Sequence, residues 1–544
     1  MIKFTYLFLI VLFSQIAFAQ VAPDQYVIFF NTKEGTPYSI DEPENFLTQR
    51  AIERRTRFSI PVNETDLPVN PAFVDSCYAA GADVRYTSRW FNFAVVEATD
   101  EIVAIIEQMS FVDASRLNRT GKVFSQATDD SKFGAPSKYK RASSPTSDDV
   151  QQQINLKPLH QLGFKGSGVR VAVIDAGFTS LDDMEAFDHL FDEGRVIATR
   201  NFADDANIYY GHSHGTSVSS IMCGRLGNEF EGSASDAEYI FIRSETGATE
   251  YLVEEYNWVA AAEFADSLGV DVINTSLGYT TFDWPQHSHT YDDLDGQTAI
   301  ASRAAGMAFD KGMLVVASAG NSGAGSWTYI GVPGDHPNVL TIGSVNVDGY
   351  YSSFSSIGLS VESGKPDVVA CGENTPYISG STVYHGNGTS FSSPLVAGAV
   401  ACLRQALPEI SGIDILNAIR QSSHLHPDNT QQMGFGIPDF TDAYFSLLDS
   451  QYIPSHLFEV DFISAYTDNQ KAIRVKFYSP RRIEAEVKIY NLQQQLFYNR
   501  KHQLEGARVT DIFIPNAEVG GSGQLLLVNI SGEGFSETKK IILP

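Results

Sequence analysis

Between residues 150 and 449, short and nearly continuous apolar runs alternate with longer segments of helical periodicity. The apolar runs predict buried strands at Val169–Ile174, Tyr239–Ile242, Val270–Asn274, Met313–Ala317 and Val339–Ser344. Helices are predicted between them at His214–Cys223, Thr249–Ser267 and Thr298–Lys311. Strands that are apolar on both faces and separated by helices are typical of a parallel sheet covered by helices on both sides. In this α/β class, ligands bind where the carboxyl ends of the strands meet.

The segments on either side of this central unit follow other patterns. Residues 20–117 mix strand and helix signals in a small α+β unit, with elements expected at Gln25–Phe30, Pro43–Arg55, Asp83–Val96, Asp100–Met109 and Phe111–Ser115. Residues 455–544 have no helical period and predict a small antiparallel β-sandwich, with strands at Ile473–Phe477, Glu486–Tyr490 and Gln524–Val528. Residues 118–149 are polar and lack a periodic apolar pattern, so they predict an exposed linker that a protease can cut.

Residues 1–19 have the pattern of a secretory signal peptide. Lys3 supplies the positive charge, Phe4–Phe13 is mostly apolar, and Ala17 and Ala19 form a small-x-small cleavage site. A membrane anchor is the competing interpretation, but this apolar run is shorter than the ~20 residues that a spanning helix needs. We therefore expect export to the outside of the cell or its outer surface, with no transmembrane segment in the mature chain.

Charge and cysteine content narrow the function classes further. The chain has 65 acidic and 38 basic residues and a formal net charge of −27, which argues against a nucleic-acid partner. Its four cysteines show neither metal-binding spacing nor a dense disulfide framework. Cys223 and Cys402 lie in apolar helical runs, and two interpretations stay open for them: buried free thiols, or a disulfide between them.

Ser390 occupies the most distinctive position in the central unit. It follows a Gly-Thr pair and precedes the apolar, alanine-rich run Leu395–Leu403, so it is expected at the start of a helix. The free N–H groups and the helix dipole at such an end favour developing negative charge. An ordinary helix-capping serine is the alternative interpretation.

Three further polar residues follow strands or begin helices in the same unit. Asp175 ends the first strand and can orient an imidazole. His214 is followed by Gly-Thr and a helical run, and is preferred to His212 as a general base. Asn321 follows an apolar strand, where its amide N–H₂ can donate to an oxyanion. Taken singly, each has a plain alternative as a turn or cap residue.

Glycine-containing strand ends predict where a peptide substrate binds. Ser276, Leu277 and Gly278 form an extended end that can pair with a peptide by strand addition, while Gly320 and Gly331 leave room beside it. The sequence Asp-Asp-Leu-Asp-Gly at 292–296 is rich in oxygen ligands and has two interpretations, a structural calcium site or a turn that caps the next helix.

The order Asp175, His214, Asn321, Ser390 resembles that of the subtilisin-like serine peptidases, and the likeness covers residues 150–449. It implies a parallel sheet with helices on both faces, a triad of Asp175, His214 and Ser390, and Asn321 as oxyanion donor. It also implies that Ser276, Leu277 and Gly278 bind substrate with Gly320 and Gly331. No cofactor is implied. Ala176 departs from the family pattern, in which Thr or Ser is usual after the aspartate.

The two flanking units carry resemblances of their own. Residues 20–117, through Arg50–Arg55, Asp66–Val69 and Ser88–Asn92, resemble the propeptides of exported subtilases from the Bacteroidetes group, which implies an intramolecular inhibitor and folding aid. Residues 455–544, through Val487–Gln493 and Lys539–Pro544, resemble the sorting domain of the type IX secretion system. The secretion machinery is then the partner of the C-terminal unit.

The sequence thus predicts a secreted serine endopeptidase that is made as a precursor and acts on protein or peptide substrates. Two alternatives from other classes remain. One is a catalytically silent binding protein with the subtilase fold. The other assigns the C-terminal sandwich to binding substrate or carbohydrate rather than to sorting.

Overall fold

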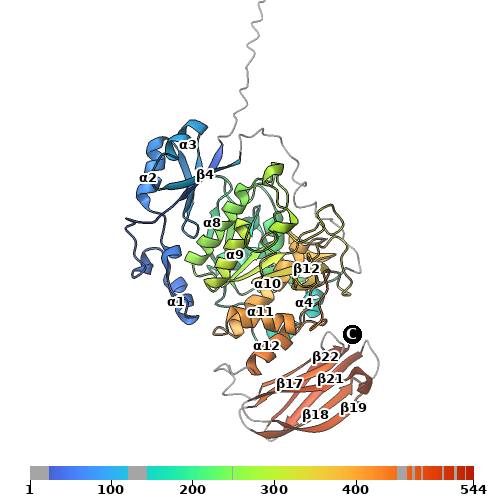
Figure 1. Ribbon diagram of the computed structural model, residues 1–544. Coiled ribbons are helices and arrows are strands. Elements are labelled where there is room, and N and C mark those ends of the chain that lie inside the picture. The colour runs from blue at the N-terminus through green and yellow to red at the C-terminus, as the bar shows by residue number, and fades with distance from the viewer. Residues whose placement is uncertain are drawn as a thin grey trace, which may run out of the picture.

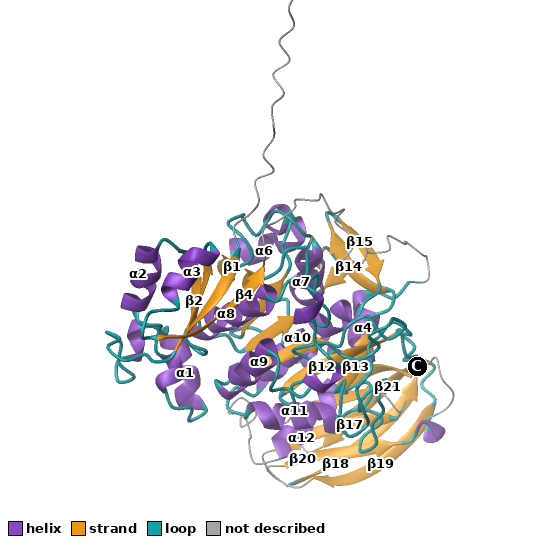
Figure 2. Ribbon diagram, turned by 45° about the horizontal axis from the view of Figure 1, so that its top comes forward, coloured by secondary structure: helices purple, strands orange, loops and turns teal. Residues whose placement is uncertain are grey.

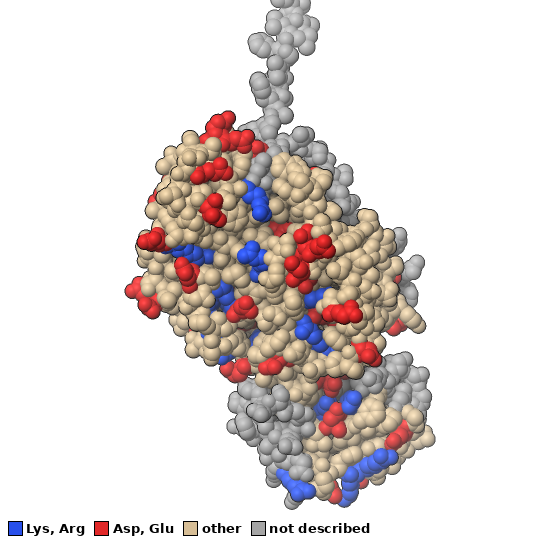
Figure 3. Space-filling model, in the orientation of Figure 1, with Lys and Arg blue, Asp and Glu red and all other residues tan. Residues whose placement is uncertain are grey.

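The computed structural model describes residues 24–119, 144–247, 249–449, 462–467, 472–479, 482–504, 508–519, 524–532 and 535–543. The predicted signal peptide and most of the predicted linker lie outside these ranges. Three units follow one another along the chain: an N-terminal α+β unit, a central α/β unit and a C-terminal β unit (Figure 1). Acidic and basic side chains are interspersed over the face seen in Figure 3.

The central unit is built on a seven-stranded parallel sheet with the order β13-β12-β11-β10-β5-β9-β6. In chain order its strands are β5 (Arg170–Asp175), β6 (Val196–Asn201), β9 (Glu238–Arg243), β10 (Val272–Thr275), β11 (Leu314–Ser318), β12 (Val339–Val345) and β13 (Val368–Cys371). Its neighbouring strands all pair in parallel. The parallel sheet predicted from the apolar runs is confirmed, with strand ends that differ by one or two residues.

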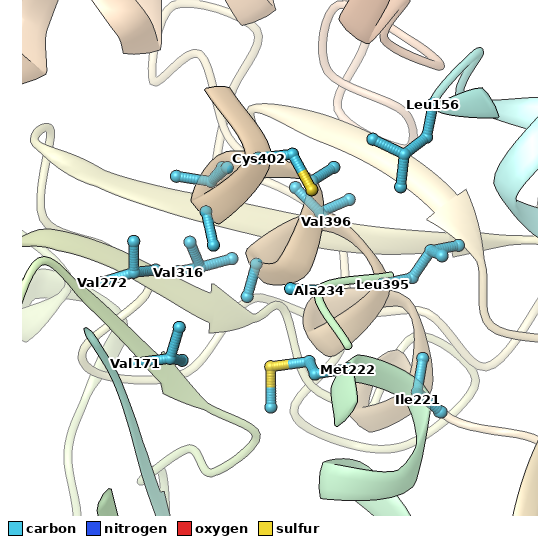
Figure 4. Packing of buried hydrophobic residues seen from close by; sticks show 14 of the residues in the cluster. Leu156, Val171, Ile221, Met222, Ala234, Val272, Val316, Leu395, Val396 and Cys402 are labelled. Carbon is cyan, nitrogen blue, oxygen red and sulfur yellow. The ribbon is translucent and has the colours of Figure 1, made fainter. Parts of the chain in front are cut away.

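Helices cover both faces of this sheet because successive strand residues point to opposite sides. Val171 and Val173 belong to one core, against α7 (His214–Cys223) and α10 (Thr389–Ala406). Figure 4 shows side chains of both helices beside those of the strands in this core. Ala172 and Ile174 belong to the opposite core, against α8 (Val253–Ser267) and α9 (Ile300–Asp310).

The predicted start of α8 at Thr249 is wrong, because the N–H of Thr249 bonds to the carbonyl of Thr246 in a turn before the helix. The smaller elements of the central unit surround the sheet (Figure 2). They are α4 (Ser147–Gln153), α5 (Lys157–Gln161), α6 (Asp188–Asp192), α11 (Gly412–Gln421) and α12 (Phe440–Asp449), with hairpins β7 (Arg225–Leu226)–β8 (Phe230–Glu231) and β14 (Thr375–Ser379)–β15 (Thr382–Gly386).

The N-terminal unit has a four-stranded antiparallel sheet with the order β2-β3-β1-β4. Its elements are β1 (Gln25–Phe30), α1 (Gln49–Arg57), α2 (Pro71–Ala80), β2 (Asp83–Ser88), β3 (Phe93–Glu97), α3 (Asp100–Ile106) and β4 (Val112–Arg119). The helix predicted at Pro43–Arg55 is divided into a 3₁₀ turn and α1, because the Thr48 hydroxyl accepts from the Ala51 N–H and starts a new helix.

The C-terminal unit contains two antiparallel sheets, with the orders β16-β17-β20 and β19-β18-β21-β22. The strands are β16 (Phe462–Thr467), β17 (Ile473–Ser479), β18 (Ile483–Asn491), β19 (Leu496–Leu504), β20 (Arg508–Ile514), β21 (Gln524–Gly532) and β22 (Phe535–Leu543). Inward-facing residues such as Val475 and Val487 share one core, as expected for a sandwich. Lys476 joins this unit to α12, since its Nζ lies 2.9 Å from the Asp442 carboxylate.

Burial distinguishes the two interpretations of the cysteines. Cys223 and Cys402 are both fully buried and free, and burial raises the pKa of each thiol. The Cys402 thiol lies 3.2 Å from the Ser233 carbonyl oxygen, and that of Cys223 lies 3.0 Å from the Ser219 carbonyl oxygen. The free-thiol interpretation is therefore confirmed. Within the described ranges, no helix is long and apolar enough to cross a bilayer.

Candidate active site

The register of the parallel strands brings the predicted site residues to one edge of the sheet. Asp175, the last residue of β5, pairs with Arg243 at the end of β9. On the other side of β5, Thr275 ends β10 beside Ile174 and Ala317. The segments that follow β10 and β11 therefore leave the sheet at the same edge as Asp175.

Asp175 and His214 form a buried pair at this edge. The Nδ1 atom of His214 lies 2.8 Å from Oδ1 of Asp175, and the aspartate is fully buried. An ionised carboxylate only accepts hydrogen bonds, so Nδ1 carries the proton and Nε2 is the basic nitrogen. Gly215 permits this approach, because a Cβ atom there would lie 2.5 Å from the Gly177 carbonyl oxygen.

The second carboxylate oxygen of Asp175 stands in a different environment. Oδ1 also accepts from the Ala176 N–H at 2.7 Å. Oδ2 is buried and has no hydrogen-bond partner among the described residues. The Ala176 side chain, which replaces the usual Thr or Ser, brings no hydroxyl to this aspartate, so the imidazole and one backbone amide hold the carboxylate through a single oxygen.

Ser390 is the second residue of α10 and is half-buried. Pro394 has no N–H, so the Ser390 carbonyl does not receive the usual hydrogen bond from four residues further on. The Ser276 hydroxyl donates to that carbonyl instead, at 3.1 Å. The Ser390 hydroxyl in turn lies 3.4 Å from the Ser276 carbonyl oxygen. The proline therefore lets the strand end at Ser276 dock directly on the start of α10.

Asn321 is oriented by Thr389, the neighbour of Ser390. Its Oδ1 atom accepts from the Thr389 N–H at 2.9 Å and from the Thr389 hydroxyl at 3.1 Å. With the oxygen held in this way, the amide nitrogen is the free end, and it has no hydrogen-bond partner within the part of the chain that the structure describes. Gly388 has φ +155°, and a Cβ atom there would lie 3.4 Å from this nitrogen.

Most of the predicted site residues line one cleft, which has a volume of about 540 Å³. It is lined by the predicted nucleophile, oxyanion donor and substrate-binding residues, namely Ser276, Leu277, Gly278, Gly320, Asn321, Gly331 and Ser390. Gly278 and Gly331 precede Tyr279 and Val332, which form an isolated antiparallel bridge between the segments that follow β10 and β11. Asp175 and His214 are not among the residues that line the cleft, but Gly247 lines it, and a Cβ atom on Gly247 would lie 3.0 Å from the ring of His212. His212 does not take the place of His214: its Nδ1 accepts from the His214 backbone N–H at 3.0 Å.

Sequence reasoning missed the residues that support Ser390 and Asn321. The Ser393 hydroxyl donates to Asn274 Oδ1 at 2.9 Å, and Asn274 Nδ2 lies 3.3 Å from the Ser276 hydroxyl. In the sequence, Thr389 stands out only as part of the Gly-Thr-Ser pattern that ends at Ser390. The polar strand end Asn-Thr-Ser after an apolar strand was the available signal for Asn274, since a fully buried asparagine needs partners.

The calcium interpretation of residues 292–296 is not supported. The Asp293 carboxylate accepts from the Thr290 N–H at 2.7 Å, and Asp295 accepts from the N–H groups of Gln297 and Thr298 at 2.7 Å each. These carboxylates cap their own turns, whereas the next helix, α9, begins after Ala299 without a side-chain cap.

Another group of carboxylates lies beside the cleft. Glu245, Glu250 and Glu254 present oxygens within 4.8 Å of one another, the type of ligand set that Ca²⁺ accepts. Two of them already accept protein hydrogen bonds: Glu245 from the Tyr279 hydroxyl at 2.5 Å, and Glu254 from the Thr246 N–H at 2.9 Å. We assign no metal ion to this cluster.

Residues 166–437, half of the chain, match the family described as "Subtilase family". The chain belongs to the subtilase family, the subtilisin-like serine endopeptidases. Residues 25–132 match "Peptidase S8 propeptide domain, Bacteroidota", so this subtilase carries a propeptide of that type before its central unit.

Several curated relatives align with the central unit of this subtilase. Subtilisin Savinase of Lederbergia lenta is 30% identical over 272 residues, covering 48% of this chain and 86% of the relative. Subtilisin E of Bacillus subtilis is 31% identical over 294 residues, covering 52% and 68%. The alkaline protease of Alkalihalobacillus alcalophilus is 30% identical to this chain, and the match spans 61% of that protease's length. The solved structure of Prenylagaramide maturation protease PagA covers 53% of this chain at 21% identity, with a TM-score of 0.42.

Proposed function

We propose that this subtilase hydrolyses peptide bonds through an acyl-enzyme formed on Ser390. The observation that carries the proposal is the buried Asp175–His214 pair, 2.8 Å apart, at the same sheet edge as the cleft that holds Ser390 and Asn321. His214 Nε2 takes the Ser390 proton as the hydroxyl attacks the peptide carbonyl, and Asp175 stabilises the imidazolium. His214 then protonates the leaving amine, and water clears the acyl-enzyme.

The oxyanion is stabilised by two donors in this proposal. The Asn321 amide nitrogen is one, because Thr389 holds the oxygen of the same amide. The Ser390 backbone N–H at the start of α10 is the other. The peptide binds as an added strand along Ser276, Leu277 and Gly278, and its side chain enters the space beside Gly331.

Replacement of the proposed nucleophile tests this function. Ser390→Ala should reduce peptide hydrolysis by several orders of magnitude and leave the precursor unprocessed. Ser392→Ala on the same helix is the matched control, because the Ser392 hydroxyl donates to the Thr389 carbonyl within the first turn of the helix. Labelling with a serine-directed phosphonate separates the enzyme from a silent binding protein. Unlabelled wild-type protein, or normal turnover by Ser390→Ala, would refute the assignment.

We further propose that the N-terminal unit is an intramolecular inhibitor and is removed by cleavage between residues 118 and 149. Support comes from the propeptide family match and from the polar composition of this stretch. N-terminal sequencing of the processed chain should give a start within this range. A start between residues 20 and 110 would contradict the proposal.

We also propose that the chain is exported through the signal at residues 1–19 and that the C-terminal unit is a sorting domain for type IX secretion. Support for the second point is the two-sheet antiparallel architecture together with the sequence likeness at Val487–Gln493. A chain truncated after Asp449 should then stay inside the cell that exports the full chain. A secreted and active truncated chain would favour the binding-module interpretation.

A further inference from the structure

One wall of the cleft is acidic. Glu245, Glu250 and Asp283 line the cleft together with Ser390, and no lysine, arginine or histidine is among the described residues that line it. Glu250 and Asp283 lie side by side, because the Asp283 N–H donates to the Glu250 carbonyl at 2.8 Å and the Asp283 carboxylate accepts from the Glu250 N–H at 3.1 Å. Glu250 is partly exposed and Asp283 is exposed, so a substrate can reach both side chains.

The carboxylates at this wall are crowded. Oxygens of Glu245, Glu250 and Glu254 lie within 4.8 Å of one another. Like charges at such distances repel, and a cation among them relieves the repulsion. Their negative field reaches the buried Tyr279, because burial and the charges of Glu245, Glu254 and Glu250 raise the pKa of its hydroxyl well above the ordinary value. This end of the cleft therefore favours a positively charged group.

The acidic wall lies at the far end of the predicted substrate-binding segment. At the near end, the Ser276 hydroxyl donates to the Ser390 carbonyl at 3.1 Å. Three residues later, the Tyr279 hydroxyl donates to the Glu245 carboxylate at 2.5 Å. An extended chain rises ~3.3 Å per residue, so roughly 10 Å of backbone separates Ser276 from Tyr279. A peptide added as a strand to this segment then presents, at the wall, a side chain about three residues from the bond that is cut.

The same part of the cleft also offers apolar surface. Leu277 and Phe282 line it, and the Phe282 ring stacks on that of Tyr279 with centroids 6.4 Å apart. Lysine and arginine combine a long aliphatic stem with a charged end. Apolar surface next to carboxylates fits such a side chain along its whole length, whereas an acidic side chain would be repelled.

The chain itself contains a segment of matching charge. Residues 131–147, within the stretch proposed for cleavage, include Lys132, Lys138, Lys140 and Arg141 and have no acidic residue. The whole chain, in contrast, has 65 acidic and 38 basic residues. A segment that enters the cleft for processing by the chain itself therefore has the charge that complements the acidic wall.

We propose that Glu250 and Asp283, together with Glu245, form a subsite that selects lysine or arginine about three residues from the cleaved bond. The substrates are then basic peptides, including the chain's own residues 131–147. This inference rests on the proposed function, because it assumes that a peptide occupies the cleft beside Ser390.

The experiment compares two synthetic peptides on the wild-type protein. One is residues 132–147 of this chain, and the other is the same peptide with Lys138→Gln, Lys140→Gln and Arg141→Gln. Mass spectrometry gives kcat/KM for each peptide and the bond that is cut. The basic peptide should be preferred by at least about tenfold, which corresponds to ~1.4 kcal/mol.

Glu250→Gln should lower this preference by about threefold or more, because it removes one of the facing charges and keeps the shape of the side chain. Glu229→Gln is the matched control, since it removes the same charge from an exposed residue that does not line the cleft. The preference of this control should equal that of the parent. Melting checks the folding of each variant, and Asp283→Asn repeats the test if Glu250→Gln does not fold.

Selection of basic peptides can be separated from hydrolysis. A protein that cuts neither peptide leaves both intact, so calorimetry on the same preparation gives their Kd values and the preference is taken from binding. Preferential binding of the basic peptide without hydrolysis, weakened by Glu250→Gln, would refute only the proposed catalysis and would support the subsite.

Equal kcat/KM for the two peptides, or equal Kd where neither is cut, would overturn the inference. A preference that Glu250→Gln and Glu229→Gln leave equally unchanged, or Asp283→Asn and Glu229→Gln where the second variant is needed, would overturn the role of the acidic wall.

Discussion

Asn321 illustrates how one neighbour fixes the orientation of an ambiguous side chain. A carboxamide can offer either its oxygen or its nitrogen to a substrate. In this subtilase two donors of Thr389 occupy the oxygen, so the nitrogen is left to face the cleft. A donor placed before the reaction begins costs no reorganisation when charge develops on the carbonyl oxygen.

We therefore expect Asn321→Leu to lower kcat by roughly 10²–10³ with little change in KM, about 3–4 kcal/mol of transition-state stabilisation. Asn321→Asp should be no better, because an ionised carboxylate cannot donate and repels the oxyanion. Steady-state kinetics and melting are measured on one preparation. A near-normal kcat with a lowered Tm would instead show that Asn321 only shapes its turn.

The start of α7 shows how a helix and a strand end are brought close enough to form the buried pair of His214 and Asp175. His214 is the first residue of α7, and Asp175 is the last of β5. The glycine after the histidine removes the side chain that would separate them, and the Gly215 N–H donates to the Gly177 carbonyl at 3.0 Å. The dyad thus depends on close backbone packing as well as on its two side chains.

Gly215→Ala should disrupt this packing, because its Cβ atom would overlap the Gly177 carbonyl oxygen. We expect a loss of about 1–3 kcal/mol in the free energy of unfolding and a large fall in kcat, as overpacking moves α7 away from β5. Ser219→Ala on the same helix is the control, since that buried hydroxyl has no partner among the described residues and its loss should be nearly neutral. The free energy of unfolding and kcat are measured for both variants. Equal values for Gly215→Ala and Ser219→Ala would contradict the packing argument.

For the molecule as a whole, buried charge pairs join the N-terminal unit to the central unit. Asp66 of the N-terminal unit pairs with Lys311 of the central unit at 2.7 Å, and Asp266 of the central unit pairs with arginines of the N-terminal unit. Burial opposes ionisation of both aspartates, but Lys311 and Arg55 lower the pKa of Asp66 below the ordinary value, and its arginine partners do the same for the pKa of Asp266. Both carboxylates therefore stabilise the precursor in their charged form.

The two aspartates make the stability of the precursor depend on pH in a defined direction. The pKa values of Asp66 and Asp266 are lower in the folded chain than the ordinary 3.8, so their stabilisation is complete above about pH 4 and is lost as the pH falls below it. We expect the Tm of the uncut Ser390→Ala precursor to stay level above about pH 4 and to fall as the pH drops below it.

Asp266→Asn should cost about 3–5 kcal/mol at pH 7, because it leaves buried guanidinium groups without their carboxylate. It should also flatten the dependence of Tm on pH. Asp205→Asn is the control, since Asp205 pairs with Arg85 across the same two units but is 86% exposed. Equal acid sensitivity of all three proteins would exclude Asp266 as a source of the effect.

Local sequence was sufficient for five of the seven strands of the parallel sheet and for the helices that cover it, whereas β6 and β13 were not predicted. The apolar runs are continuous wherever a strand is covered on both faces, so β5, β9 and β12 were predicted to within one residue at each end. Asp175 and Ser390 were found because a strand end and a helix start impose recognisable neighbours. The antiparallel C-terminal unit followed from the absence of a helical period.

Only the tertiary structure decided how distant segments meet. Nothing local to Ser390 reveals that its carbonyl, left free by Pro394, is bonded by a serine 114 positions earlier. The helical pattern of α1 likewise does not reveal that Arg54 and Arg55 both bind Asp266, which lies more than 200 positions away. Such partners depend on the register of the sheet and the docking of whole units. Periodicity records which face of an element is buried, but not which segment covers it.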